Sequence, residues 1–223
     1  TPYAAFWGHD ASSVRTIAQK PNRFLAVRTA PLPGRKLKSA EAVWEKAGSV
    51  LLAERIRFNT HRCIALGFDS RVLGNTWWSF NANDLSPDAI KALLLWLNSS
   101  LSVLLYYSRR VVTEGAFVGM KKPAWGAMPV LDVRKLSSCK LSTLASEYDS
   151  VATQELSPLA QLNQDKTRIR IDEALCKALG LPDLSPLREL LTREPGLSAQ
   201  DIGRGSPEMD LEDEEPGGAD DAA

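Results

Sequence analysis

An amphipathic segment near the middle of the chain constrains the fold more than any other feature. Ser86, Pro87 and Asp88 supply a hydroxyl N-cap, a first-turn proline and an acid at the positive end of a helix dipole. Arg109 and Arg110 suit the opposite end. Between them, apolar residues recur at intervals of three, four and seven, and they are Ile90, Leu93, Leu94, Leu97, Leu101, Leu104 and Leu105. This spacing predicts one long helix with a wide apolar stripe for burial in the core.

The upstream residues favour short strands. Residues 23–28 alternate in the manner of a strand, and residues 49–58 read as a buried strand whose end places Arg55 and Arg57 on one face. Residues 61–68 and 71–80 indicate two further strands separated by Asp69 and Ser70, so an antiparallel meander is expected. Residues 40–47 favour a short helix by composition.

The downstream residues favour helices. We expect them over residues 136–154, 163–179 and 186–192, with Gly180 and Pro182 ending the second. Arg168 and Asp172 are spaced for an i,i+4 ion pair. From about Leu197 onward the sequence is polar, glycine-containing and then acidic, which predicts disorder.

These patterns predict an α+β fold, in which a mixed or antiparallel curved sheet packs on a long helix and is followed by a C-terminal helical bundle and a disordered acidic tail. The expected divisions are a first domain over residues 1–135, a helical subdomain over 136–196 and the tail over 197–223. At 223 residues and 44% apolar composition, the chain can bury one sizeable core, alone or with a small satellite.

Several features bear on the cellular compartment. The longest apolar run, residues 92–107, is interrupted by polar residues and is shorter than the roughly 20 residues that cross a bilayer, so no membrane span is expected. Cys63, Cys139 and Cys176 form no CxxC pair, which argues against a disulfide framework or a zinc site and favours the cytoplasm. Thr1 is preceded by no initiator methionine or leader, so we expect a start inside a longer protein.

Charge is unevenly distributed although the formal net charge is zero. Residues 208–223 contain eight acids and no Lys or Arg, so all 27 basic residues but only 19 of the 27 acidic ones lie upstream. A surplus of this kind is compatible with a polyanionic partner, and the alternative is an ordinary solvated surface with an acidic solubilising tail.

Common catalytic motifs are absent from the sequence. The two histidines, His9 and His61, lack the spacing of a zinc hydrolase, and neither a GxSxG elbow nor a phosphate-binding GxxxxGK[ST] loop occurs. The chain also lacks the glycine-rich loop and the Pro-Pro-aromatic motif that an S-adenosylmethionine-dependent adenine methylase needs. We therefore expect that the chain by itself is not an enzyme and holds no cofactor or metal.

Three clusters of residues are candidates for binding nucleic acid. The first lies within eight positions and consists of Arg55, Arg57, Asn59, His61 and Arg62. Arginines neutralise phosphates, and a guanidinium fork can read guanine edges. The alternative for any one of them is a solvated strand edge with protective charges.

The second cluster combines tryptophans with polar side chains, namely Arg71, Asn75, Trp77 and Trp78. Adjacent residues of a strand point to opposite faces, so at most one of the two indoles can enter the same core. The other must meet solvent, another domain or a ligand, although structural packing remains the alternative for either indole alone. Asparagine side chains can pair with adenine edges.

The third cluster flanks Gly115, Gly119 and Gly126 and consists of Arg109, Arg110, Lys121, Lys122 and Trp125. Glycine lets a backbone approach closely, lysine neutralises phosphate, and tryptophan can wedge or stack. This combination favours a loop that faces a polyanion, against the alternative of a simply solvated loop.

The order of these parts resembles a known family. A leucine-rich helix is followed by a glycine, a basic aromatic loop and a Met-Pro-Val strand, here Leu97-Asn98-Ser99, Gly115, Lys121-Lys122-Pro123-Ala124-Trp125 and Met128-Pro129-Val130. Residues 51–57 and 61–65 resemble the strand pair that precedes this helix, and residues 168–172 and 179–181 more faintly resemble the C-terminal helices. The segment over residues 49–133 is thus similar to the target recognition domain of bacterial N6-adenine DNA methyltransferases, including TaqI-like and type I or type IIG restriction-modification enzymes.

The resemblance implies a DNA target recognition module for restriction-modification or phage defence. Its partners would be double-stranded DNA, a catalytic methyltransferase domain or subunit outside this chain, and further restriction or defence subunits. S-adenosylmethionine would be bound by that catalytic domain. Asn98 and Ser99 are assigned no base contact, since polar residues in an apolar helix must satisfy their hydrogen bonds where they pack. The alternative is an interaction scaffold of a defence complex.

Overall fold

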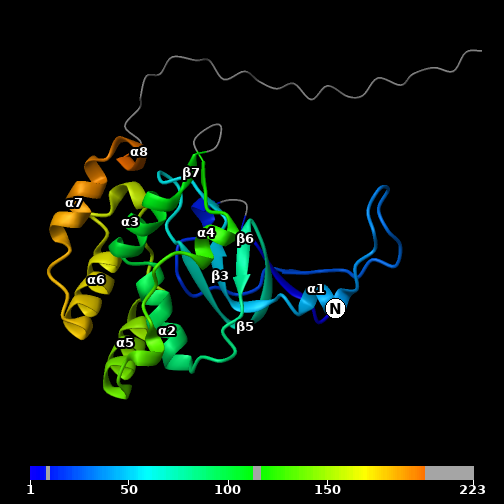
Figure 1. Cartoon of the computed structure of the whole chain (residues 1–223), viewed down its shortest axis with the longest axis horizontal. Helices are drawn as coiled ribbons and strands as arrows, with labels where there is room; N and C mark the ends of the chain where they lie inside the picture. Colours follow the sequence, from blue (N-terminus) through cyan, green and yellow to red (C-terminus); the bar gives the residue numbers. More distant parts are fainter. Residues whose placement is uncertain (9–10, 113–116, 199–223) are drawn as a thin grey trace, which may run out of the picture.

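A computed structural model describes residues 1–8, 11–112 and 117–198, and it shows an α+β fold in which a sheet lies beside a group of helices (Figure 1). The main sheet has the strand order β2-β1-β5-β3-β6. β1 runs parallel to β5 and the other neighbours are antiparallel, so the sheet is mixed. Its strands are β1 (Ala4–Trp7), β2 (Arg23–Phe24), β3 (Gly48–Ala53), β5 (Ala65–Asn75) and β6 (Trp77–Phe80). The expected α+β class is confirmed.

The expected meander is wrong, because β3 lies between β5 and β6. The chain does not turn at Asp69 and Ser70, which are exposed within the continuous strand β5. The register between β3 and β5 shifts between Gly48 and Val50, so this polar pair falls in an irregularity of the strand. A β-bulge accommodates such residues without ending the strand.

The N-terminal elements are shorter than expected. The strand predicted over residues 23–28 is limited to β2, an edge strand whose two residues are exposed. The predicted helix over 40–47 forms as α1 (Ala40–Trp44), and the Ser39 side chain accepts a hydrogen bond from the backbone N–H of Ala42 at its start. A 3-10 turn, η1 (Ala11–Ser13), follows β1.

The central helix begins as predicted but breaks in the middle. α2 (Pro87–Leu97) starts with Ser86, whose hydroxyl accepts from the N–H of Ala89, and α3 (Ser100–Arg109) starts with Ser99, whose hydroxyl accepts from the N–H of Ser102. The two helices meet at a bend of 65°. The expected single long helix is therefore wrong, because Ser99 caps a second helix where the apolar spacing suggested continuation. Within the described residues, no single helix is long and apolar enough to cross a membrane, and this bent pair passes that test only as a pair.

The C-terminal residues fold into helices that cover α2 and α3 on the side away from the sheet (Figure 1). The first two predicted helices form with narrower bounds and the third extends one residue further at each end, and Gly180 ends α6 with a φ of 71° as expected. Leu197, expected in the tail, is instead fully buried. The elements are η2 (Val133–Lys135), α5 (Ser138–Val151), η3 (Leu159–Gln161), α6 (Lys166–Leu179), α7 (Ser185–Arg193) and α8 (Pro195–Ser198).

The predicted ion pair between Arg168 and Asp172 does not form. Arg168 instead pairs with Asp165 at 3.4 Å, and Asp172 pairs with Arg188 at 2.6 Å. Asp172 also accepts hydrogen bonds from the backbone N–H and the hydroxyl of Ser100, at 2.9 and 2.6 Å. Ser100 at the start of α3 and Arg188 on α7 therefore bind the Asp172 carboxylate, which the sequence spacing had paired with Arg168.

A second, small sheet connects the main sheet to the helices. Its order is β4-β8-β7, and both pairs are antiparallel. The strands are β4 (Arg55–Ile56), β7 (Val111–Val112) and β8 (Val118–Gly119), and α4 (Lys122–Gly126) follows β8. Glu54 separates β3 from β4, so the strand expected over residues 49–58 is divided between the two sheets.

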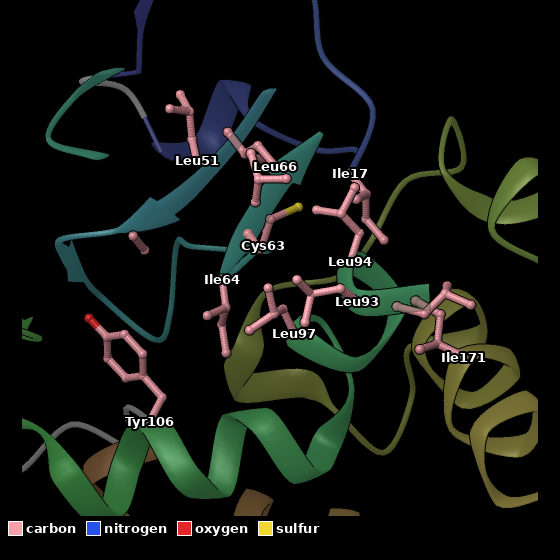
Figure 2. Close-up of a cluster of buried hydrophobic side chains, with 14 of the residues drawn as sticks. Ile17, Leu51, Cys63, Ile64, Leu66, Leu93, Leu94, Leu97, Tyr106 and Ile171 are labelled. Atoms are coloured by element: carbon pink, nitrogen blue, oxygen red, sulfur yellow. The ribbon is translucent and has the colours of Figure 1, made fainter. Parts of the chain in front are cut away.

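One cluster of buried apolar side chains fills the space between the main sheet and the helices. Figure 2 shows Leu94 and Leu97 of α2 near Ile64 and Leu66 at the start of β5. Ile171 of α6 belongs to the same cluster. The helical part over residues 136–196 thus packs directly on the first part and shares its core.

Candidate nucleic-acid interface

The small sheet presents two arginines on one face. Arg55 and Arg57 are exposed, whereas Ile56 and Phe58 between and beyond them are buried, as the alternation predicts. The guanidinium carbons of both arginines lie over the ring of Phe117, at 5.2 and 5.8 Å from its centroid. A cation over an aromatic face is attracted by the ring quadrupole, so Phe117 holds the two guanidinium groups side by side.

Two lysines follow the neighbouring strand. Gly119 in β8 is paired with Arg55, and the next N–H, that of Met120, donates to the carbonyl of Glu54 at 2.8 Å. This antiparallel pairing places Lys121 and Lys122, both exposed at the start of α4, near the start of β4. The exposed Arg109 ends α3 two residues before Val111, which pairs with Gly119 in the same sheet.

The cationic side chains near the small sheet lack acidic partners in the part of the chain that the structure describes. In the described ranges, none of Arg55, Arg57, Arg109, Lys121 and Lys122 is ion-paired with an acid. We call these five residues together with Phe117 the basic face. Exposed cations without an acidic partner are available to the phosphates of a polyanion.

His61, from the first predicted cluster, has a structural position instead. It is only 8% exposed, and its Nδ1 accepts a hydrogen bond from the backbone N–H of Arg57 at 2.9 Å. Burial lowers the pKa of His61 to about 4, with a further lowering from the charge of Arg55. A histidine that is neutral at physiological pH adds no positive charge to the basic face.

Arg62 is also withdrawn from the surface. Its guanidinium donates to the carbonyl of Leu156 at 2.6 Å, and its own carbonyl accepts from the fully buried Arg168 at 2.6 Å. Arg62 therefore ties the start of the main sheet to the C-terminal helices, under which it lies. The structure does not bring it together with Arg55 and Arg57.

Arg71 lies elsewhere in the fold, on β5. Its guanidinium donates to the carbonyls of Ala47 and Trp44, at 3.1 and 2.9 Å, and stacks over the Trp44 ring at 5.7 Å from the centroid. These contacts fix the end of α1 on the main sheet. Asn75, at the end of β5, is half-buried and also lies outside the basic face.

The tryptophans serve mainly to pack the fold. Trp77 is buried against Phe6 in an edge-to-face contact at 6.5 Å, and Trp78 points to the opposite face of β6, where it is half-buried. The indole N–H of Trp125 donates to the carbonyl of Ala53 at 3.1 Å, and only 8% of this residue is exposed. The expected alternation of the adjacent indoles is thus confirmed, whereas Trp125 is not on the exposed surface that a wedging residue needs.

Asn59 is exposed in the turn that follows Arg57, close in sequence to the basic face. Gly115, part of the predicted loop, lies outside the described residues. The sequence analysis did not identify Phe117. A usable signal was present, because Phe117 is an aromatic residue two positions before Gly119, which lies in the strand opposite the alternating arginines. It also missed the partners of the buried Asp172, because Ser100 lies 72 positions and Arg188 lies 16 positions away in the sequence.

The described residues contain no group of His, Cys, Asp and Glu side chains that could hold a metal ion. In the same ranges no loop with several glycines joins a strand to a helix, so no site for S-adenosylmethionine can be assigned in this part of the chain. Comparison of the chain with protein-family models, with curated proteins and with solved structures found no match.

Proposed function

We propose that this chain is a DNA recognition module that contacts duplex DNA through the basic face. The observation that carries the proposal is the pair Arg55 and Arg57, which are exposed, lie over the ring of Phe117 and are ion-paired with no acid among the described residues. Lys121 and Lys122 extend the positive surface along the adjoining strand and helix. Arginine and lysine contacts to phosphates supply most of the affinity in such complexes.

By the resemblance of residues 49–133, the module would serve an adenine-N6 DNA methyltransferase of a restriction-modification or phage-defence system. The catalytic domain, outside this chain, would bind S-adenosylmethionine and the rotated adenine. This chain would hold the duplex and read base edges. The duplex-binding role is supported by the basic face, and the methyltransferase assignment is supported by the ordered sequence signatures alone.

A salt titration of binding to short DNA duplexes tests the proposal. Affinity should fall steeply with salt, with a slope of about −0.9 in log K per phosphate contacted. The double substitution R55E/R57E should flatten that slope by roughly two and weaken binding at every salt concentration. The matched control K140E/K177E reverses two exposed lysines on α5 and α6, away from the small sheet, and should leave the slope within about half a unit.

The same variants separate this function from the scaffold alternative. An interaction scaffold predicts that reversing Arg55, Arg57, Lys121 and Lys122 leaves the activity of the full assembly intact. A DNA module predicts a large loss of site-specific methylation. Undetectable duplex binding at low salt, with the catalytic domain joined, would overturn the proposal.

A further inference from the structure

A cavity of about 330 Å³ lies between the main sheet, α2 and α4. Its walls include Leu52 and Trp78, which are neighbours on β3 and β6, together with Leu97 of α2 and Trp125 of α4. Phe80 and Val130, which are 38% and 48% exposed, also line it. The exposure of these two residues shows that the space is open to solvent, so a ligand could enter it from outside. It falls within the size range of small-molecule sites, roughly 300–1,000 Å³.

The neutral polar side chains in the cavity walls are already hydrogen-bonded within the protein. The indole N–H of Trp78 donates to the carbonyl of Met120 at 3.2 Å, and that of Trp125 donates to the carbonyl of Ala53 at 3.1 Å. The hydroxyl of Ser79 donates to the carbonyl of Val72 at 3.3 Å. The walls therefore offer ring faces and methyl groups to an occupant, which favours an apolar molecular body.

Lys122 gives the cavity its charge. It is the only charged side chain among the described lining residues, and it is ion-paired with no acid within the ranges described. Lys122 is exposed at the start of α4 and lines the cavity, and a lysine in such a position can keep its ammonium group in water while its methylene stem covers apolar surface. An anionic group on the occupant would complement it there.

We propose that this cavity binds a small amphipathic anion, with an aromatic or aliphatic body between the Trp78 and Trp125 rings and a single carboxylate or sulfonate beside Lys122. The proposal adds a small-molecule site to the module and shares only Lys122 with the basic face. It rests on three observations: the volume, the hydrogen-bonded polar side chains of the walls, and the single positive charge among the described lining residues. A neutral apolar molecule would fill the cavity but leave Lys122 without a partner, and a cation would meet like charge.

Titration with 8-anilinonaphthalene-1-sulfonate tests the site, because this dye combines an aromatic body with one sulfonate and fluoresces when it leaves water. Octanoate should displace the dye better than octanol, and octanol better than octylammonium. The substitution K122E should weaken dye binding about fivefold and invert the order of octanoate and octylammonium. K121E changes the neighbouring lysine, which is absent from the cavity wall, and should preserve the order.

A second pair of variants tests the location. Gly126 lines the cavity, and a Cβ atom at this position would have no heavy atom within 4 Å, so we expect G126L to place its side chain in the space without disturbing α4. This variant should unfold as cooperatively as the original chain and lose dye binding by more than tenfold. A127L adds the same side chain at the next, exposed position and should bind normally. The proposal would be overturned if G126L bound the dye as tightly as the original chain does. It would also be overturned if octanoate and octylammonium displaced the dye equally well from the original chain, or if the original chain bound no dye. Should G126L fail to fold, the inverted competition order of K122E decides.

Discussion

The side-chain amide of Asn98 clamps the end of α2 to Ala65 at the start of β5. Its Oδ1 accepts from the backbone N–H groups of Ile64 and Ala65, at 3.0 and 3.3 Å, and its Nδ2 donates to the carbonyl of Ala65 at 2.9 Å. A further bond from Nδ2 reaches the carbonyl of Leu94 at 2.9 Å. The asparagine of the Leu-Asn-Ser signature is thus fully hydrogen-bonded inside the protein, which agrees with assigning it no base contact.

Replacing Asn98 with alanine should destabilise the chain by about 3 kcal/mol. The substitution leaves buried backbone groups of Ile64 and Ala65 without their partner, and each such loss costs roughly 1–3 kcal/mol. Urea unfolding followed by circular dichroism measures the change. N83A removes an exposed asparagine just after β6 and should stay within about 0.5 kcal/mol of the original stability. If N98A lost no more stability than N83A, the structural role of the Asn98 hydrogen bonds would be contradicted.

The buried pair of Asp172 and Arg188 should show strong energetic coupling. Both residues are nearly inaccessible, so D172N or R188M alone leaves a buried group without its partner and should cost about 3–5 kcal/mol. The double variant should cost less than the sum, giving a coupling of roughly 2 kcal/mol in a double-mutant cycle. The exposed pair of Lys91 and Asp149, at 2.7 Å, should give about 0.5 kcal/mol in the same experiment. Similar coupling for both pairs would show that burial has no influence here.

Sequence patterns predicted those parts of the fold that depend on near neighbours. The hydroxyl of Ser86 and the αL residue Gly180 act within their own helices, so the start of α2 and the end of α6 could be foreseen. The break at Asn98 could not be foreseen, because the Asn98 side chain hydrogen-bonds to Ile64 and Ala65, which lie more than thirty positions away. The strand order was also inaccessible, since the insertion of β3 between β5 and β6 depends on tertiary pairing.

The residues of the candidate site also differ in whether local sequence patterns could predict their positions. Alternation alone placed Arg55 and Arg57 on one exposed face, because side-chain direction in a strand is a local property. The roles of Arg62 and Arg71 depend on carbonyl groups of Leu156 and Ala47, which no local pattern identifies. Composition gives the number of basic residues, but it cannot distinguish a guanidinium group that hydrogen-bonds to the protein's own carbonyls from one that faces solvent.

Gly180 should be the glycine most sensitive to alanine substitution at a helix end. Its φ of 71° lies in the left-handed region, where an L side chain costs roughly 1–2 kcal/mol. G180A should therefore lower the free energy of unfolding by that amount. G126A is the matched control, because Gly126 lies within α4, has no positive φ and has open space at its side-chain position. It should be neutral or slightly stabilising, and a larger loss for G126A than for G180A would contradict the backbone explanation.

His61 should make the chain less stable as the solution becomes acidic. Its pKa is lowered from 6.5 to about 4 in the folded state, mainly because burial disfavours the charged ring. Between these two pH values the unfolded chain binds a proton that the folded chain does not, so the free energy of unfolding decreases as pH falls. The full effect is about 3 kcal/mol, complete near pH 4, and this group contributes no slope above about pH 7.

The variant H61N isolates this effect, because an asparagine oxygen can replace Nδ1 as acceptor for the backbone N–H of Arg57 without titrating. Unfolding free energies of both proteins, measured by urea from pH 8 to pH 4, should differ by a constant amount above pH 7. The original chain should then lose stability relative to H61N as the pH falls. NMR titration of the His61 ring in the folded protein should give a midpoint near 4. A midpoint close to 6.5, or a stability difference that does not vary with pH, would show that the ring is hydrated rather than buried under Phe117 and the Arg57 turn.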